Sequence, residues 1–188
     1  MNKPPGARRA VFLDRDGTLN VEINQVLIPD RVTLIEGAGE AVRAINEAGL
    51  LAILITNQAV IARGYCDEKD LEQVHARLRE LLARDGGHLD GIYYCPHHPD
   101  YTGACGCRKP ESGLIRRAQT DFEIDVTRSW VVGDSVKDVR LARTVGASSA
   151  LVRTGKAGSD LGPDDHPDRV FHTVLDAAEF ITEGVLTR

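Results

Sequence analysis

Short apolar segments alternate with amphipathic ones along this chain, and no other feature constrains the fold as strongly. The apolar segments lie at Ala10–Leu13 and at residues 50–55, 91–94, 130–132 and 149–152. Apolar residues at helical spacing predict helices over residues 38–48, 71–81, 114–122, 136–145 and 174–181. Short runs that are apolar throughout are typical of parallel strands buried on both faces. The sequence therefore predicts the α/β class, with a three-layer, doubly wound parallel sheet covered by helices on both faces.

Length and charge narrow the function classes. The 188 residues show no repeat or linker, so we expect a single domain over residues 1–188. With 23 basic and 28 acidic side chains, the net charge of −5 supplies no basic field for nucleic acid. No apolar run approaches the roughly 20 residues that span a membrane, and Asp14 interrupts the first run too early for a signal peptide. We expect a cytoplasmic monomer that binds neither nucleic acid nor membrane.

Polar residues follow the predicted strands at the points where these strands end. Asp14 and Asp16 come directly after the first strand, Thr56 after the second, and Asp134 after the fourth, while Lys109 precedes the third helix. The carboxyl ends of parallel strands meet at one edge, so these side chains should gather there. Two carboxylates so close together are costly without a cation, and their oxygens suit Mg²⁺. The set predicts metal-assisted phosphoryl transfer.

Cysteine and histidine cluster in a second pattern. Three thiols and one imidazole within thirteen residues form a full tetrahedral set for a structural Zn²⁺. The set is Cys95, His97, Cys105 and Cys107. His98 is an alternative to His97, and Cys66 stands apart as a structural thiol. This predicted zinc loop, residues 95–107, leads into Arg108 and Lys109, and would hold both cations at the predicted crevice.

Four motifs resemble the signatures of the haloacid dehalogenase (HAD) phosphatase superfamily. They are residues 11–18, with the sequence Val-Phe-Leu-Asp-Arg-Asp-Gly-Thr, then Thr56, Lys109, and residues 133–138. The resemblance implies that Asp14 is the nucleophile and that Asp16 acts as acid and then as base. It implies that Thr56 and Lys109 hold the phosphoryl group, and that Mg²⁺ binds Asp14, the backbone carbonyl of Asp16, and Asp134. Asp138 would orient this network, and no segment is long enough for a cap domain.

Within the superfamily, the zinc loop is similar to that of two capless families. These are the D-glycero-D-manno-heptose 1,7-bisphosphate phosphatases and the histidinol-phosphate phosphatases, and residues 56–64, 90–98 and 151–156 favour the former. That resemblance implies removal of the 7-phosphate to leave heptose 1-phosphate, a step toward nucleotide-activated heptose for lipopolysaccharide. It also implies that the phosphorylated sugar contacts Asn57, Gln58, Arg63, Arg108 and Lys109.

Three departures from the heptose family concern substrate contacts rather than the chemistry. Ala59 and Val60 replace a common Ser-Gly, residues 22–25 lack the usual His-Gly-Tyr, and Ser135 stands where Lys is common. A histidinol-phosphate phosphatase therefore stays open as an alternative. So does a different class, an inactive zinc-stabilised binding module. A kinase or GTPase is disfavoured because the sequence has no Gly-rich phosphate loop.

Overall fold

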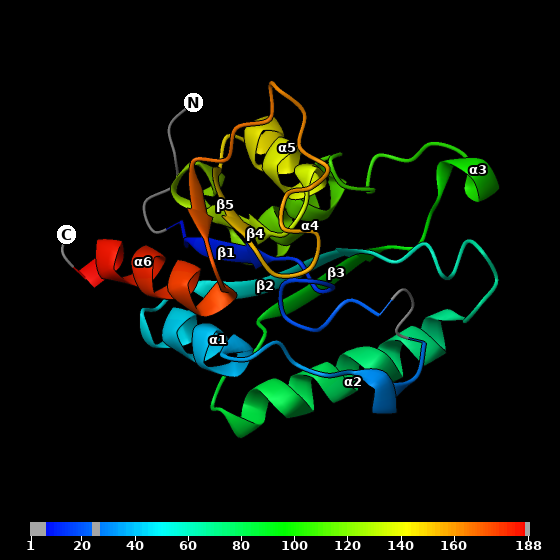
Figure 1. Cartoon of the computed structure of the whole chain (residues 1–188), viewed down its shortest axis with the longest axis horizontal. Helices are drawn as coiled ribbons and strands as arrows, with labels where there is room; N and C mark the ends of the chain where they lie inside the picture. The colour runs from blue at the N-terminus through cyan, green and yellow to red at the C-terminus, as the bar shows by residue number, and fades with distance from the viewer. Residues whose placement is uncertain (1–6, 24–26, 187–188) are drawn as a thin grey trace.

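Six parallel strands form the central sheet of the computed structural model, which describes residues 7–23 and 27–186. Their order across the sheet is β3-β2-β1-β4-β5-β6 (Figure 1). The strands are β1 (Ala10–Leu13), β2 (Leu51–Asn57), β3 (Gly91–Cys95), β4 (Trp130–Gly133), β5 (Ser148–Val152) and β6 (Arg169–Phe171). The five predicted strands are confirmed to within two residues at each end, and the sixth was not predicted.

Helices cover both faces of the sheet, which confirms the three-layer prediction. On one face lie α1 (Ala38–Glu47), α2 (Glu68–Arg84) and α6 (Val174–Leu186). On the other lie α4 (Gly113–Phe122) and α5 (Val136–Val145), as Figure 1 shows. The remaining helical segments are short: α3 (Pro99–Thr102) and the 3₁₀ turns η1 (Pro29–Arg31) and η2 (Val126–Arg128).

β1 is apolar throughout because it contributes side chains to two cores. In β1, Val11 and Leu13 pack into the core shared with α1, α2 and α6. Ala10 and Phe12, between them, pack into the core beneath α4 and α5. Alternate side chains point to opposite faces of a strand, so covering both faces leaves no position for a polar residue within it.

The strand order explains why the polar residues lie where they do. β1 pairs with β2 on one side and with β4 on the other, so the order reverses beside β1. In an open α/β sheet, the crevice outside the carboxyl ends of the strands forms at such a reversal. Asp14 follows β1 and Asp134 follows β4, which places both at this crevice.

Two elements escaped prediction because each is too short to carry a pattern. β6 has three residues at the sheet edge, and its first, Arg169, is exposed. α3 has four residues and follows His98, whose ring nitrogen accepts a hydrogen bond from the Asp100 backbone N–H. Among the described residues, no helix combines the length and the apolar character needed to cross a membrane.

Candidate active site

A polar cleft at the carboxyl ends of the strands brings together the chemistry-bearing residues singled out in the sequence. Asp14, Asp16, Thr56, Lys109 and Asp134 all line it. The predicted sugar contacts line it as well: Asn57, Gln58, Arg63 and Arg108. Residues more than a hundred positions apart thus share one cavity, as the alternating pattern requires.

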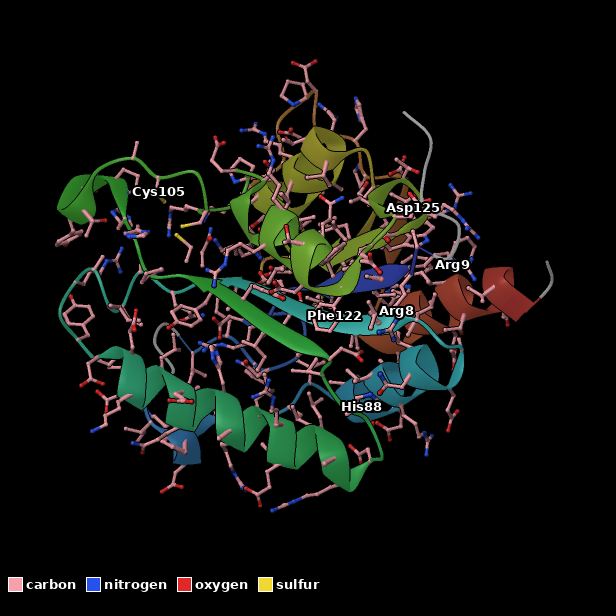
Figure 2. The ribbon with its side chains drawn as sticks, turned by 180° about the vertical axis from the view of Figure 1, so that it is seen from behind. Arg8, Arg9, His88, Cys105, Phe122 and Asp125 are labelled. Carbon is pink, nitrogen blue, oxygen red and sulfur yellow. The ribbon has the colours of Figure 1, made fainter. Side chains whose placement is uncertain are left out.

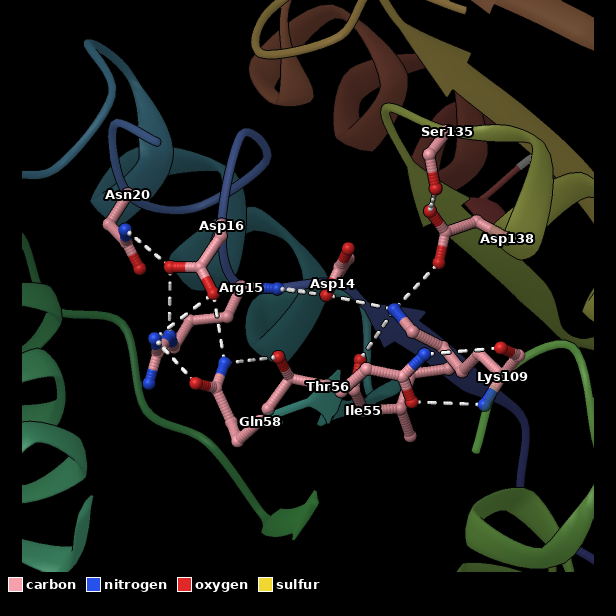
Figure 3. A network of polar contacts seen from close by, with 11 residues as sticks. Asp14, Arg15, Asp16, Asn20, Ile55, Thr56, Gln58, Lys109, Ser135 and Asp138 are labelled. Atoms are coloured by element: carbon pink, nitrogen blue, oxygen red, sulfur yellow. Dashed lines mark hydrogen bonds and ion pairs between the residues drawn. The ribbon is translucent and has the colours of Figure 1, made fainter. Parts of the chain in front are cut away.

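The buried ammonium group of Lys109 is central to this cleft (Figure 3). Its Nζ lies 2.8 Å from Asp14 Oδ1 and 2.7 Å from Asp138 Oδ1, and it donates to the Ile55 carbonyl at 3.0 Å. Burial disfavours the charged form of Lys109. The negative charges of Asp138 and Asp14 outweigh this effect and raise the pKa of Lys109. Burial raises the pKa of Asp14 to about 7 despite the nearby Lys109. A doubly paired lysine therefore stays charged here.

The two oxygens of Asp14 differ in their surroundings. Oδ1 accepts hydrogen bonds from Lys109 Nζ and, at 2.7 Å, from the backbone N–H of Arg15. Within residues 7–23 and 27–186, Oδ2 has no hydrogen-bond partner. The side chain is thus fixed through one oxygen, and the other is free to attack an electrophile or to bind a cation.

Asp16 is held by three side chains, all donors. Arg15 donates from Nε at 3.1 Å and from Nη2 at 3.0 Å, Asn20 donates at 3.0 Å and Gln58 at 2.9 Å. Burial opposes the charge of Asp16, but the Arg15 guanidinium and these hydrogen bonds prevail and lower its pKa. To move a proton, Asp16 must give up at least one of these contacts.

Arg15 itself was missed in the sequence, where an arginine between two aspartates looks solvated. It is among the most completely buried side chains of the protein, with 1% of its surface exposed. Its Nη1 lies 3.5 Å from Nε2 of His75, which α2 directs toward the cleft. Burial, together with the positive charge of Arg15, lowers the pKa of His75 to about 3. The His75 imidazole is therefore neutral, so it does not repel the Arg15 guanidinium that it contacts.

Thr56 and Asn57 end β2 and Gln58 follows it directly, and the side chains of Asn57 and Gln58 hold other site residues. Gln58 Nε2 donates to Thr56 Oγ1 at 2.8 Å, which leaves the hydroxyl proton of Thr56 free to point elsewhere. The Asn57 side chain accepts from the Lys109 backbone N–H at 2.9 Å and donates to the Lys109 carbonyl at 3.1 Å. Asn57 therefore ties Lys109 to β2, whereas a contact with substrate remains a prediction for Asn57 and Gln58.

Carboxylate oxygens of Asp14, Asp134 and Asp138 lie within 4.8 Å of one another, close enough to share a metal ion. Asp138 is engaged through both oxygens, with Lys109 at 2.7 Å and the Ser135 hydroxyl at 2.8 Å. Burial raises the pKa of Asp134 to about 6. The oxygen donors of Asp14 and Asp134 therefore fit a hard divalent cation, and Asp138 fits the orienting role.

Glycine makes room for Asp134. A Cβ atom on Gly17 or on Gly155 would collide with its carboxylate, and both glycines have positive φ, +81° and +57°. The backbone N–H of Lys156, next to Gly155, donates to Asp134 Oδ2 at 2.6 Å. The loop after β1 and the loop after β5 thus close around this carboxylate at van der Waals distance.

The Cys/His cluster lies at the end of β3 and on the segment between β3 and α4, at the same end of the molecule as the cleft. Figure 2 shows Cys105 there, far from Arg8 and Asp125 at the opposite end of the sheet. The three Sγ–Sγ distances are 3.1, 3.5 and 3.6 Å, and His97 Nδ1 lies 3.3 Å from Cys107 Sγ. Tetrahedral zinc with Zn–S bonds of about 2.3 Å places sulfurs roughly 3.8 Å apart. Cys95, His97, Cys105 and Cys107 could therefore hold zinc.

This loop also positions a cation of the cleft. Arg108 Nη1 donates to the His97 carbonyl at 3.0 Å, so the guanidinium is tied to a residue of the Cys/His cluster. Two more cations line the cleft, Lys137 in the first turn of α5 and Lys156 after β5. Neither lysine was singled out in the sequence, because a lysine in a helix or a loop is most often solvated.

The residues that depart from the heptose family also lie around this cleft. Glu22, Ile23, Ala59, Val60 and Ser135 line it, while positions 24 and 25 fall outside the described residues. None of the five lining residues contributes an oxygen to the Asp14, Asp134 and Asp138 group, although the Ser135 hydroxyl donates to Asp138. The departures therefore concern the walls of the cleft and one hydrogen-bond partner of Asp138.

Known proteins resemble this chain along most of its length. Residues 106–177 match the HAD-hydrolase-like family. The D-glycero-beta-D-manno-heptose-1,7-bisphosphate 7-phosphatase of Haemophilus ducreyi is 41% identical over 180 residues, which cover 93% of this chain and 98% of that protein. The enzyme of the same name from Pseudomonas aeruginosa is 41% identical over 157 residues, or 83% of this chain and 87% of that one.

A solved structure gives the same result for the fold. The D,D-heptose 1,7-bisphosphate phosphatase from B. bronchiseptica, complexed with magnesium and phosphate, matches with a TM-score of 0.86 and 32% identity. The match covers 94% of this chain and 99% of that one. The sequence leaves two substrates open, heptose 1,7-bisphosphate and histidinol phosphate. These relatives are named for heptose 1,7-bisphosphate.

Proposed function

Because the chain belongs to the D-glycero-D-manno-heptose-1,7-bisphosphate 7-phosphatase family of HAD-like hydrolases, we propose that it removes the 7-phosphate of this sugar and releases heptose 1-phosphate. The relatives are named for the β anomer, so we propose the β anomer as substrate. The observation that carries the proposal is the Lys109–Asp14 ion pair of 2.8 Å, which fixes one oxygen of a carboxylate that lines the cleft.

In the first half of the reaction, Asp14 Oδ2 attacks phosphorus and the bond to the sugar oxygen breaks, which leaves an aspartyl-phosphate. Asp16 gives its proton to that departing oxygen. Because Arg15 and two amides favour the ionised form of Asp16, the residue must be protonated as substrate binds and must turn from Arg15 toward the cleft. In the second half, Asp16 takes a proton from water, and the water oxygen attacks phosphorus. The bond between phosphorus and the Asp14 oxygen breaks, inorganic phosphate leaves, and Asp14 returns as a carboxylate and Asp16 in its protonated form.

Thr56 and Lys109 stabilise the phosphoryl oxygens during both halves. The Thr56 hydroxyl can donate because its oxygen already accepts from Gln58. Lys109 lies against Asp14 and stays charged because Asp138 pairs with it as well. Fixed donors and charges of this kind act without reorganisation as negative charge moves onto the transferring group. Arg63 and Arg108, farther out, take the distal part of the sugar phosphate.

Two metals complete the proposal. Asp14, Asp134 and the backbone carbonyl of Asp16 would hold Mg²⁺, which would neutralise the negative charge of the incoming phosphate. Zn²⁺ would be bound by Cys95, His97, Cys105 and Cys107. Four protein ligands leave no open position, so the zinc is structural and fixes the loop that carries Arg108 and Lys109.

The cellular setting is part of the proposal. Three thiols that must stay reduced to bind zinc suit the cytoplasm, where we place the protein as a monomer. There its product feeds the synthesis of nucleotide-activated heptose for lipopolysaccharide. Light scattering on the purified protein tests the monomer.

A substrate panel tests the proposed specificity. We expect the highest kcat/KM for the β anomer of heptose 1,7-bisphosphate, ahead of the α anomer, fructose 1,6-bisphosphate and histidinol phosphate. We expect EDTA to abolish phosphate release and Mg²⁺ to restore it. A preference for histidinol phosphate would overturn the specificity and leave the chemistry standing, and activity undiminished by EDTA would overturn the role of Mg²⁺.

A further inference from the structure

Two buried side chains beside the cleft have no role in the proposed reaction, those of Arg15 and His75. Their exposed fractions are 1% and 4%. A guanidinium group without access to solvent is costly to bury unless it is paired and hydrogen-bonded. The partners of Arg15 therefore indicate what its burial achieves.

The guanidinium of Arg15 contacts Asp16 with two nitrogens at once. Nε donates to Oδ1 at 3.1 Å and Nη2 donates to Oδ2 at 3.0 Å, as Figure 3 shows. Such a planar fork on both oxygens fixes the plane of a carboxylate as well as its position, which an ammonium group cannot do. Arg15 thus sets the orientation of Asp16, the proposed acid and base.

Gln58 extends this contact to Thr56. Its Oε1 accepts from Arg15 Nη2 at 3.1 Å, and its Nε2 donates to Asp16 Oδ2 at 2.9 Å and to Thr56 Oγ1 at 2.8 Å. Since a guanidinium can only donate, Arg15 determines which end of the Gln58 amide faces it. Arg15, Gln58 and Asp16 therefore form a closed ring of hydrogen bonds beside Thr56.

His75 contacts the guanidinium at the nitrogen outside the fork. Its Nε2 lies 3.5 Å from Arg15 Nη1, and its ring lies 5.8 Å from that of Tyr94 on β3. Because the guanidinium can only donate, Nε2 is the accepting nitrogen and the imidazole proton is on Nδ1. Val74 and Leu78, beside His75 on α2, are buried in the core. The helix α2, which contributes no reacting group, therefore supports Arg15 through His75.

We propose that Arg15 is a positioning residue for Asp16, and that His75 holds Arg15 in place. This inference rests on the proposed function, because it assumes that Asp16 protonates the departing sugar oxygen. The ring of hydrogen bonds keeps the Asp16 carboxyl in one orientation beside Thr56, from which it turns toward that oxygen. Ordering the acid in advance lowers the barrier of the step that needs it. A reaction whose leaving group needs no proton gains nothing from this order.

The test compares an alkyl phosphate with an aryl phosphate. Heptose 1,7-bisphosphate releases a sugar oxygen that must be protonated, whereas p-nitrophenyl phosphate releases a stable anion that needs no proton. With both substrates, kcat/KM reports the formation of the aspartyl-phosphate, so the later hydrolysis does not enter. Arg15→Lys keeps the charge and loses the fork. For this variant we expect kcat/KM to fall at least about tenfold more with the alkyl phosphate than with the aryl phosphate.

His75 supplies a second variant, which carries the test if Arg15→Lys does not fold. His75→Leu should show the same selective loss at about threefold, because Arg15 loses one support and keeps its contacts with Asp16. His75→Gln, whose side-chain oxygen can accept from Arg15, should restore most of the lost activity. Arg79→Lys, at an exposed position on α2, is the matched control and should behave as wild type.

The outcomes separate this inference from the proposed function. Equal losses with both substrates, or no loss with either, would overturn the inference and leave the function standing. An undiminished effect of Arg15→Lys in an Asp16→Asn background would also overturn it, because the effect must pass through Asp16.

The wild-type protein decides the proposed function in the same experiment. If it hydrolyses fructose 1,6-bisphosphate and not the heptose sugar, the proposed specificity fails. The comparison is then made with fructose 1,6-bisphosphate as the alkyl phosphate, since it depends on the leaving oxygen and not on the sugar. A wild-type protein that is inactive with every phosphate ester would overturn both proposals.

Discussion

Lys109 places its positive charge between two buried carboxylates, those of Asp14 and Asp138. Its removal leaves the carboxylate of Asp138, which is buried, facing that of Asp14 with no cation between them. We expect Lys109→Met to lower the free energy of unfolding by about 3–5 kcal/mol, the usual effect of removing one partner of a buried ion pair. Urea unfolding in EDTA at pH 7 measures it, with Lys69→Met as the surface control. A loss below about 1 kcal/mol would show that this pairing is not a structural requirement.

His75 makes stability depend on pH. Its pKa is about 3 in the folded protein and ordinarily 6.5, so the unfolded chain binds the proton more readily. Stability is therefore full above pH 6.5 and falls as pH drops toward 3. Between pH 7.5 and pH 5 the expected loss from this residue is about 2 kcal/mol. The charges that set the shift beside burial are those of Arg15, Asp16 and Arg79.

Denaturant unfolding of wild type and His75→Gln at both pH values tests this dependence. We expect the variant to lose about 2 kcal/mol less than wild type over the interval, whatever its stability at pH 7.5. His166→Gln, at an exposed position, is the control and should behave as wild type. Equal losses in wild type and His75→Gln would mean that another group is responsible.

The sequence predicts the strand-end carboxylates well because each has a fixed place relative to a strand. It does not reveal Arg15 and His75, since their burial depends on α2 folding over the loop that follows β1. An arginine between two aspartates reads as a solvated residue, and only the folded chain shows that it binds Asp16 and Gln58 at once. Nothing local in the sequence encodes such a network.

At the scale of elements, the predicted zinc loop leads directly into two cations of the site. Arg108 and Lys109 directly follow Cys107, and Arg108 is tied to the His97 carbonyl. We expect wild-type protein to carry about one zinc per chain. We expect Cys107→Ser to lose it, and kcat/KM to fall by at least about tenfold because Lys109 is displaced.

Metal analysis and phosphate release, measured on the same preparations, check this expectation. Cys66→Ser is the matched control, because Cys66 lies outside the cluster of four and should leave both readouts unchanged. An absence of zinc from freshly purified wild-type protein would show that the Cys/His cluster does not bind zinc. Full activity in a zinc-free Cys107→Ser protein would show that the loop keeps its place without it.

The helices and strands that are long enough to show a regular spacing of apolar residues are predicted from the sequence, and the shorter ones are not. The five buried strands and five amphipathic helices follow from apolar spacing, whereas β6 and α3 have too few residues for any spacing to register. The segment at residues 156–167 reads as a surface loop. It also supplies Asp160, whose Oδ1 accepts from the Val136 N–H at the start of α5. That contact depends on tertiary folding and leaves no local signal.

For the whole molecule, the order of the strands determines which polar residues meet in the cleft. The alternation of strands and helices predicts the layers, but the reversal beside β1 appears only in the fold, and it brings Asp14 and Asp134 together from positions 120 residues apart in sequence. The chain carries a net charge of −5, while the cleft wall carries four cations without a carboxylate partner among the described residues. This local reversal of charge suits an anionic substrate with two phosphates.

Phosphate release from heptose 1,7-bisphosphate in the presence of Mg²⁺, by wild type and by Asp14→Asn, tests the central claim most directly. Asn keeps the shape of the side chain but replaces one carboxylate oxygen and the negative charge by a neutral amide, which is a poor nucleophile, so a folded Asp14→Asn protein isolates the chemical step. We expect wild type to release one phosphate per sugar and leave heptose 1-phosphate, and Asp14→Asn to lose activity by at least about a thousandfold. Turnover by Asp14→Asn equal to that of wild type would contradict the account.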